Sequence, residues 1–302
     1  TPATRIFTLC LFFVSGAFLL WCGYVEFYPA LWACALTFIT LCVRYLQQGR
    51  GFLLMLLAFC LTCVVHLQAL VFLPGLAYAV VLQEWGKKHG RSIGGYWVAG
   101  LVTAGIVFIA GFFWLVSTRI EFESMFLPLF TGRPRSPDYA ILTGKHLLDI
   151  ANQLLLIFPL ILLVIGRSMT RTGENRTTGE FAVAGFWSIG TILFVFVVDP
   201  VIGLGRDWDL MSLTIFPVML FAMLFLKSIP QLFPTRLVIA AVVTAVLATA
   251  CYVGVNVSRT ASETRFHELL RYYGVKNRSG WVIFCSYFRE QGQISTAAQI
   301  RD

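Results

Sequence analysis

The feature that most constrains this chain is a series of long apolar stretches separated by short polar loops. Such stretches can cross the ~30 Å hydrocarbon layer of a bilayer as helices, which satisfy their own backbone groups. Their spacing predicts nine spans, at about 6–22, 29–45, 52–65, 69–81, 96–117, 154–165, 181–198, 210–226 and 237–255. We therefore expect an all-α, polytopic helical membrane protein that has membrane lipids as partners.

Composition agrees with this fold class and excludes a nucleic-acid-binding protein. Hydrophobic residues make up 58% of the chain and charged residues 13%. The formal net charge of +8 comes from basic residues scattered among short loops, which is the pattern that orients a membrane protein. Cys60 and Cys63 have the spacing of a redox or metal pair, but they lie within an apolar span without a second pair, so we expect no metal site there.

Basic residues in alternate loops predict the orientation of the chain. One set of loops carries ten of them: Arg44, Arg50, Lys87, Lys88, Arg91, Arg167, Arg171, Arg176, Lys227 and Arg236. The short loops of the other set carry only Arg206. The first set is expected in the cytoplasm, so the chain after residue 255 is expected on the outer face. No charged leader with a cleavage site follows Thr1, so we expect the first span to be a permanent helix.

A polar loop at 199–209 separates the seventh and eighth spans and is the strongest candidate for a functional site. Either Asp207 or Asp209 can cap the helix that follows, which is a structural role. The other carboxylate is then available as a base. Arg206 is suited to contact a phosphate, and Trp208 offers a flat face to a sugar or a lipid headgroup.

Two further polar groups lie in loops expected on the same face. Glu26, in the first loop, is either a solvated carboxylate or part of a polar cavity. His66 lies between two short spans, which predicts a tight hairpin or a broken helix. Polar backbone at this depth must be covered by protein, so we expect this joint to face the interior of the bundle.

A polar stripe follows the long loop expected on the outer face. His146, Asp149, Asn152 and Gln153 recur at steps of three and four residues, so they share one face of a helix. This pattern favours an interfacial helix that lies along the membrane, and the alternative is that the stripe lines the wall of a cavity.

The chain after residue 255 forms a second unit by its composition. Large residues between Trp281 and Phe288, followed by Ala297, have the spacing of the first helix and the start of the second helix of a tetratricopeptide repeat. One repeat cannot bury its own face. We therefore expect a membrane domain at 1–255 and an outward-facing helical tail at 256–302, which either begins a longer repeat array or caps the membrane domain and offers a surface to a protein partner.

Four motifs carry a resemblance to a known family. They are Gly23-Tyr24-Val25-Glu26-Phe27-Tyr28-Pro29, His66 ahead of Leu73-Pro74, His146-Leu147-Leu148-Asp149-Ile150-Ala151-Asn152, and Arg206-Asp207-Trp208-Asp209-Leu210. Together they resemble bacterial membrane proteins related to GT-C fold glycosyltransferases. With its tail, the chain also resembles the transmembrane O-mannosyltransferases that carry tetratricopeptide repeats.

This resemblance implies a bacterial inner-membrane enzyme that moves a sugar from a polyprenyl-phosphate carrier to an acceptor at the outer face. Asp207, Asp209 and Glu26 would be catalytic, while Arg206, Trp208, His66, His146, Asp149 and Asn152 would bind substrate. No metal ligands are assigned, although a divalent cation is compatible with these acids. Family members usually place an acid in the first outer loop; here that loop offers only Glu26, so the usual base lies upstream of Thr1 or is absent. The alternative function is a non-catalytic anchoring or assembly subunit of an envelope or energy-transducing complex.

Overall fold

The computed structural model describes residues 28–89, 126–130, 139–157, 179–199, 210–228, 235–273 and 278–301. In these ranges the chain is helical and contains no strand, apart from one isolated bridge between Phe126 and Val198. Two described helices, α2 and α9, are long and apolar enough to cross a membrane; a third is added if the bent pair α11 and α12 counts as one span. The helical fold is therefore confirmed for the described residues, and two or three of their helices have the length and composition of membrane spans. The spans predicted at 6–22 and 96–117, and most of the span predicted at 154–165, lie outside the described residues.

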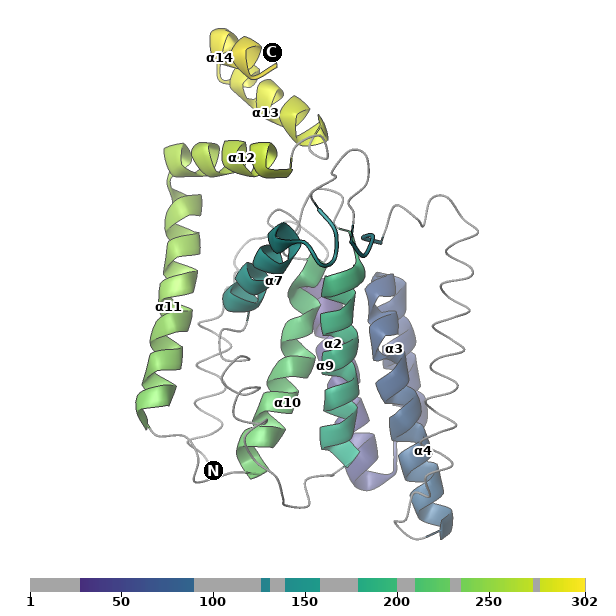
Figure 1. The fold of residues 1–302 in the computed structure, drawn as a ribbon. Helices are drawn as coiled ribbons and strands as arrows, with labels where there is room; N and C mark the ends of the chain where they lie inside the picture. The colour runs from purple at the N-terminus through teal and green to yellow at the C-terminus, as the bar shows by residue number, and fades with distance from the viewer. Residues whose placement is uncertain are drawn as a thin grey trace.

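The described helices of the bundle run alternately up and down (Figure 1). They are α2 (Tyr28–Gln48), α3 (Phe52–Val65), α4 (Leu73–His89), α9 (Gly179–Val197), α10 (Ile215–Ser228) and α11 (Thr235–Val257). Two short 3-10 turns, η2 (Leu67–Phe72) and η3 (Leu210–Thr214), lie at the end of the bundle from which the C-terminal tail rises. We call this the tail end; the turn from α2 to α3, with Arg50, lies at the opposite end.

The core of the bundle is a cluster of aromatic side chains around α9. Trp187 and Phe38 are fully buried, and their ring centroids lie 5.4 Å apart. The indole N–H of Trp187 donates to the backbone oxygen of Phe72 at 2.9 Å. Gly190 lets η2 approach α9 closely, because a Cβ there would lie 2.8 Å from the backbone oxygen of Val71. Dense packing of this kind fixes the position of η2, and with it the tail end of α3 and α4.

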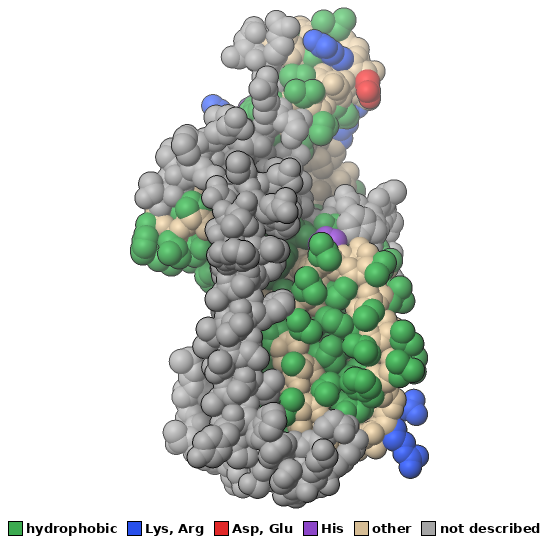
Figure 2. All heavy atoms as spheres, turned by 90° about the vertical axis from the view of Figure 1, so that its right-hand side faces the viewer, with side chains coloured by type: hydrophobic (Ala, Val, Ile, Leu, Met, Phe, Trp, Pro, Cys, Tyr) green, Lys and Arg blue, Asp and Glu red, His purple; other side chains and the backbone are tan. Residues whose placement is uncertain are grey.

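One face of the bundle is covered with exposed apolar side chains (Figure 2). On α3 they are Phe52, Leu53, Leu54, Leu57, Leu61 and Val64. Arg44 and Arg50 are exposed near the opposite end. An apolar face of this length bounded by basic residues is what a lipid-facing helix requires.

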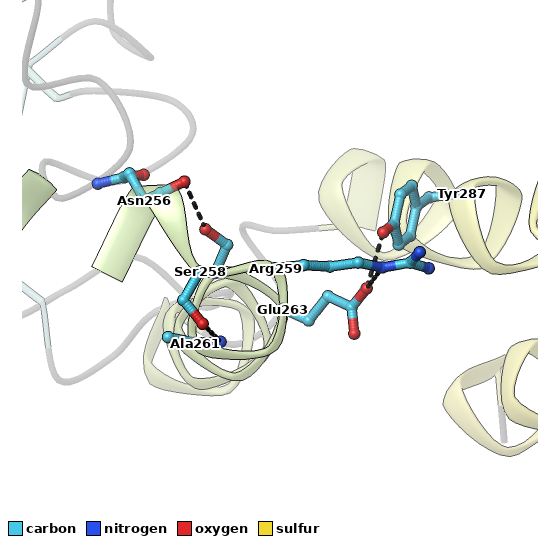
Figure 3. Close-up of polar contacts among 7 residues, drawn as sticks. Asn256, Ser258, Arg259, Ala261, Glu263 and Tyr287 are labelled. Atoms are coloured by element: carbon cyan, nitrogen blue, oxygen red, sulfur yellow. Dashed lines mark hydrogen bonds and ion pairs between the residues drawn. The ribbon is translucent and has the colours of Figure 1, made fainter. Parts of the chain in front are cut away.

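The tail begins where α11 bends by 101° into α12 (Arg259–Tyr273). Figure 3 shows the polar contacts of the residues around this bend and of α12 with α13. The Arg259 guanidinium donates to Glu263 Oε1 at 2.8 Å, and the Tyr287 hydroxyl donates to the same oxygen at 2.7 Å. These two hydrogen bonds, from Arg259 and then from Tyr287, hold the pKa of Glu263 below its ordinary value. The carboxylate of Glu263 therefore joins the tail helix α13 to α12.

The tail ends in a helical hairpin of α13 (Arg278–Glu290) and α14 (Ile294–Arg301). Phe284, Phe288 and Ala297 are buried together with Leu270 of α12. Gly292, with φ of 74°, makes the turn between the two helices, a conformation that glycine adopts without steric cost. The large and small residues singled out by their spacing thus pack against one another, while the assignment to the tetratricopeptide family stays a prediction.

Candidate functional site

The polar stripe lies on α7 (Gly144–Ile157) at the tail end and faces the interior of the protein. His146 is fully buried, and Asp149 and Gln153 are 9% and 4% exposed. The apolar Leu148 on the other side of the helix is 55% exposed. Asn152 is exposed and does not belong to the buried face. The polar face of α7 is therefore turned toward protein, away from the surroundings that its leucines meet.

A hydrogen-bonded chain links this face to a loop and to α9. The Tyr139 hydroxyl donates to Asp149 Oδ2 at 2.8 Å and lies 3.3 Å from His146 Nδ1. His146 Nε2 lies 2.9 Å from the backbone oxygen of Phe196, near the end of α9. We call Tyr139, His146 and Asp149 the relay. Buried polar groups in such a chain polarise one another, so the relay is held in one arrangement.

The relay lies beside both ends of the segment that contains Arg206. Ile150 of α7 packs with Val195 of α9 and Met211 of η3 in one apolar cluster. Asp199, the last described residue before that segment, is 6% exposed, and η3 resumes the chain at Leu210. Residues 200–209, and with them Arg206, Asp207, Trp208 and Asp209, lie outside the described residues, as does Glu26.

His66 lies at the same end of the bundle. Its backbone is extended between α3 and η2, and its Nδ1 accepts a hydrogen bond from the backbone N–H of Gln68 at 3.1 Å. Its ring lies 6.0 Å from that of Tyr28, one turn of α2 from Trp32, whose indole donates to Ser212 next to Met211. His66 is thus joined to the relay through packed residues, without touching it among the contacts described.

Gln68 brings a buried amide to this end of the bundle. Its side chain is 4% exposed, and among the described residues neither amide atom has a hydrogen-bond partner. An unpaired buried polar group costs about 1–3 kcal/mol. This amide is therefore a polar group that a water molecule or a ligand hydroxyl would stabilise.

The tail helix α12 covers the relay. Leu269 and Tyr272 pack against the apolar cluster of Leu127 and Tyr139. The Tyr272 hydroxyl donates to the backbone oxygen of Lys145 at 3.4 Å, and the Lys145 ammonium lies 5.2 Å from the centre of the Tyr272 ring. Sequence reasoning missed Tyr139 and Tyr272, because neither belongs to a periodic pattern and both reach α7 from other segments.

The described part of the chain offers no group of three His, Cys, Asp or Glu side chains arranged to hold a metal ion. The described cysteines, including Cys60 and Cys63, are free thiols. Glu26, Asp207 and Asp209, the acids with which a divalent cation is compatible, lie outside the described residues.

Searches among protein-family models, curated proteins and solved structures find no match to this chain.

Proposed function

We propose that this protein is a GT-C-type membrane glycosyltransferase that moves a sugar from a polyprenyl-phosphate carrier to an acceptor at the extracytoplasmic face. One observation carries the proposal: the buried polar face of α7 packs beside α9 and η3, which bound the segment containing Arg206. Leu210, the one described residue of the fourth motif, therefore packs against the same apolar cluster as Ile150 of the third motif. Buried carboxylate and imidazole groups at such a place are costly unless they serve a site.

The chemistry assigned to these residues is an inverting transfer. Such a reaction needs a carboxylate to deprotonate the acceptor and positive charge to stabilise the departing phosphate. Arg206 supplies the charge, aided by the free amides at the start of the helix near Leu210. Asp207 or Asp209 supports transfer, and the other caps that helix.

The same proposal includes a bacterial inner-membrane location, nine spans and an extracytoplasmic tail. It is supported by the ten basic residues in alternate loops. The described helices support this orientation, because Arg50, which belongs to the basic set of loops, lies at the opposite end of the bundle from η2, η3 and the tail.

The test is transfer of labelled sugar from a panel of polyprenyl-phosphate donors by the full-length protein in vesicles. Arg206→Ala is expected to weaken carrier binding by about 1.5–3 kcal/mol, the value of one charge-assisted contact. Asp207→Asn and Asp209→Asn are expected to differ, one lowering turnover about a hundredfold and the other mainly lowering stability. Arg44→Ala, which removes an exposed arginine at the opposite end, is the matched control. Full transfer by all three variants would show that the loop is structural.

A second function, that of a non-catalytic anchoring subunit, is favoured by the surface of the tail. Val282 and Ile283 on α13 are 61% and 59% exposed, which is the kind of surface that binds a protein partner. This function predicts no transfer by the wild-type protein with any donor. It also predicts a partner that co-purifies with the wild type and is lost when both residues are replaced by serine.

A further inference from the structure

Two buried side chains at the tail end carry polar atoms that have no hydrogen-bond partner among the described residues. These atoms are both amide atoms of Gln68, on η2, and the hydroxyl oxygen of Thr214, on η3. Gln68 is 4% exposed and Thr214 is 3% exposed. Because buried polar groups are nearly always hydrogen-bonded, each exception requires an explanation of its own.

Other buried hydroxyls of the described bundle show what Thr214 lacks. Thr62, Ser188 and Thr191 each donate to a backbone oxygen four residues earlier on their own helix. Ser212, on the same turn as Thr214, accepts a hydrogen bond from an indole. The unpaired hydroxyl of Thr214 is therefore a property of this position and not of buried hydroxyls in this bundle.

The two turns that carry these groups belong to the same end of one core. Both η2 and η3 pack against α9. Ala69, next to Gln68, and Leu213, next to Thr214, are buried in the same apolar cluster as Trp32. The unpaired amide and the unpaired hydroxyl are therefore both brought by 3-10 turns to the tail end of the bundle, where His66 and the relay also lie.

The unpaired groups are uncharged, which determines the chemistry that they can bind. The amide of Gln68 both donates and accepts hydrogen bonds, and so does the hydroxyl of Thr214. A phosphate or a carboxylate only accepts, so it would leave the amide oxygen of Gln68 unpaired. A neutral molecule with neighbouring hydroxyl groups donates and accepts at adjacent positions, as a sugar does, and it can therefore satisfy both side chains.

We propose that Gln68 and Thr214 bind hydroxyl groups of the sugar on the lipid-linked donor and select which sugar is accepted. This proposal rests on the glycosyltransferase function and adds the residues that recognise the sugar. The turn η3 follows directly on the segment whose Arg206 is assigned to the phosphate. The side chain of Gln68 is long and rotatable, so its amide can turn toward a sugar while the backbone of η2 stays in place. A site that hydrogen-bonds a hydroxyl strongly disfavours a substrate that lacks it.

The test measures binding to the full-length protein in detergent micelles by calorimetry, which requires no transfer. The probes are farnesyl phosphate that carries mannose, glucose or galactose. Farnesyl phosphate alone, the free monosaccharides and phosphatidylglycerol separate a sugar on its carrier from other sources of hydroxyl groups. At least one sugar-carrying probe is expected to bind about tenfold more tightly than farnesyl phosphate. A deoxy analogue of that probe is expected to lose the gain.

Gln68→Met removes the amide while nearly keeping the length of the side chain, and Thr214→Val replaces the hydroxyl with a methyl group. Each variant is expected to lose about tenfold in affinity for the preferred sugar-carrying probe and to keep its affinity for farnesyl phosphate. Without a ligand, each is expected to unfold at the wild-type temperature or above it, because an apolar group replaces an unpaired buried polar group.

Two controls match these variants. Ser212→Ala removes a paired hydroxyl from the same turn as Thr214, so this variant is expected to unfold at a lower temperature than the wild type. Gln47→Met changes an exposed glutamine near the opposite end of the bundle, and it is expected to alter neither the affinity nor the unfolding temperature.

The sugar site is overturned if the wild type binds no sugar-carrying probe more tightly than it binds farnesyl phosphate, the free monosaccharides or phosphatidylglycerol. A lower unfolding temperature of Gln68→Met with unchanged affinity also overturns it and assigns the amide to a bound water molecule. Transfer by the wild type, with wild-type affinities in both variants, would remove the sugar site and leave the glycosyltransferase function. Sugar-dependent binding that both variants lose, without any transfer by the wild type, would do the reverse.

Discussion

The bundle core and the face of α7 bury polar groups in two different ways. In the core, the indole N–H of Trp187 donates to the backbone oxygen of Phe72, and that of Trp32 donates to the hydroxyl of Ser212. Neither indole can gain or lose a proton at ordinary pH. In the relay, by contrast, the Tyr139 hydroxyl faces an acid and an imidazole, both of which titrate. The comparison teaches that hydrogen bonds between neutral groups fix helix positions at any pH, whereas hydrogen bonds to an acid and an imidazole depend on pH.

The largest expected effect comes from breaking the core itself. Trp187→Ala removes a fully buried side chain and its hydrogen bond to η2, and it is expected to lower the free energy of unfolding by about 3–5 kcal/mol. Reversible unfolding in mixed detergent micelles measures this value. Ile189→Ala, at a side chain 60% exposed on the same helix, is the control and is expected to change it by less than about 1 kcal/mol. Similar losses in both variants would mean that Trp187 does not anchor η2.

A smaller effect separates the two kinds of polar burial by their dependence on pH. Ser212→Ala leaves the Trp32 N–H without this acceptor and is expected to cost about 1–3 kcal/mol, equally at acidic and alkaline pH. Tyr139→Phe removes the hydroxyl that donates to Asp149 Oδ2, and it is expected to cost about 1.5–3 kcal/mol where that carboxylate is ionised and less at acidic pH, because a hydrogen bond to a charged group is worth more than one to a neutral group. The same unfolding assay at two pH values measures both; a cost of Tyr139→Phe that does not vary with pH would contradict the distinction.

The smallest effect concerns a titratable group at the surface. Because the pKa of Glu263 is lowered in the folded protein, its contacts contribute above the ordinary pKa of a glutamate and are lost as the pH falls through the lowered value. Acidification, or Glu263→Gln at neutral pH, is expected to loosen α13 from α12 with little change in overall stability. Distances between spin labels on the two helices measure this, with exposed Glu268→Gln as control. An unchanged distance in Glu263→Gln would show that the apolar contacts alone hold the hairpin.

Sequence periodicity predicted three of the described helices well, whereas the span predicted at 69–81 is the turn η2 followed by α4. The bounds predicted for α3 are those observed, and α2 and α9 each begin and end within three residues of the predicted spans. The helix after the loop at 199–209 begins at Leu210, as expected from the capping residues before it, but its first turn is a 3-10 turn. These elements are predictable because burial in lipid requires apolar residues and a helical backbone, both of which are local properties.

The site was less predictable, because it depends on which segments meet. The spacing of His146, Asp149 and Gln153 predicted a common face, yet the same spacing fits a helix that shows this face to water. The hydrogen bond from the Tyr139 hydroxyl to Asp149 shows that this face is turned toward protein. Tyr139 comes from a different segment of the chain, so the spacing of residues on α7 does not predict it. Asn152 was included because it lies three residues after Asp149, although the buried face continues through Gln153.

The bend between α11 and α12 also gives the tail a second connection to the bundle, apart from the chain itself. Tyr287 of α13 donates to Glu263 of α12, so this carboxylate joins the α13–α14 hairpin to α12. Near the other end of α12, the Tyr272 hydroxyl donates to the backbone oxygen of Lys145 on α7, and the Tyr272 ring packs against the cluster that contains Tyr139 of the relay. The hairpin is therefore linked through α12 to α7, the helix that carries His146 and Asp149, by two contacts, at Glu263 and at Tyr272.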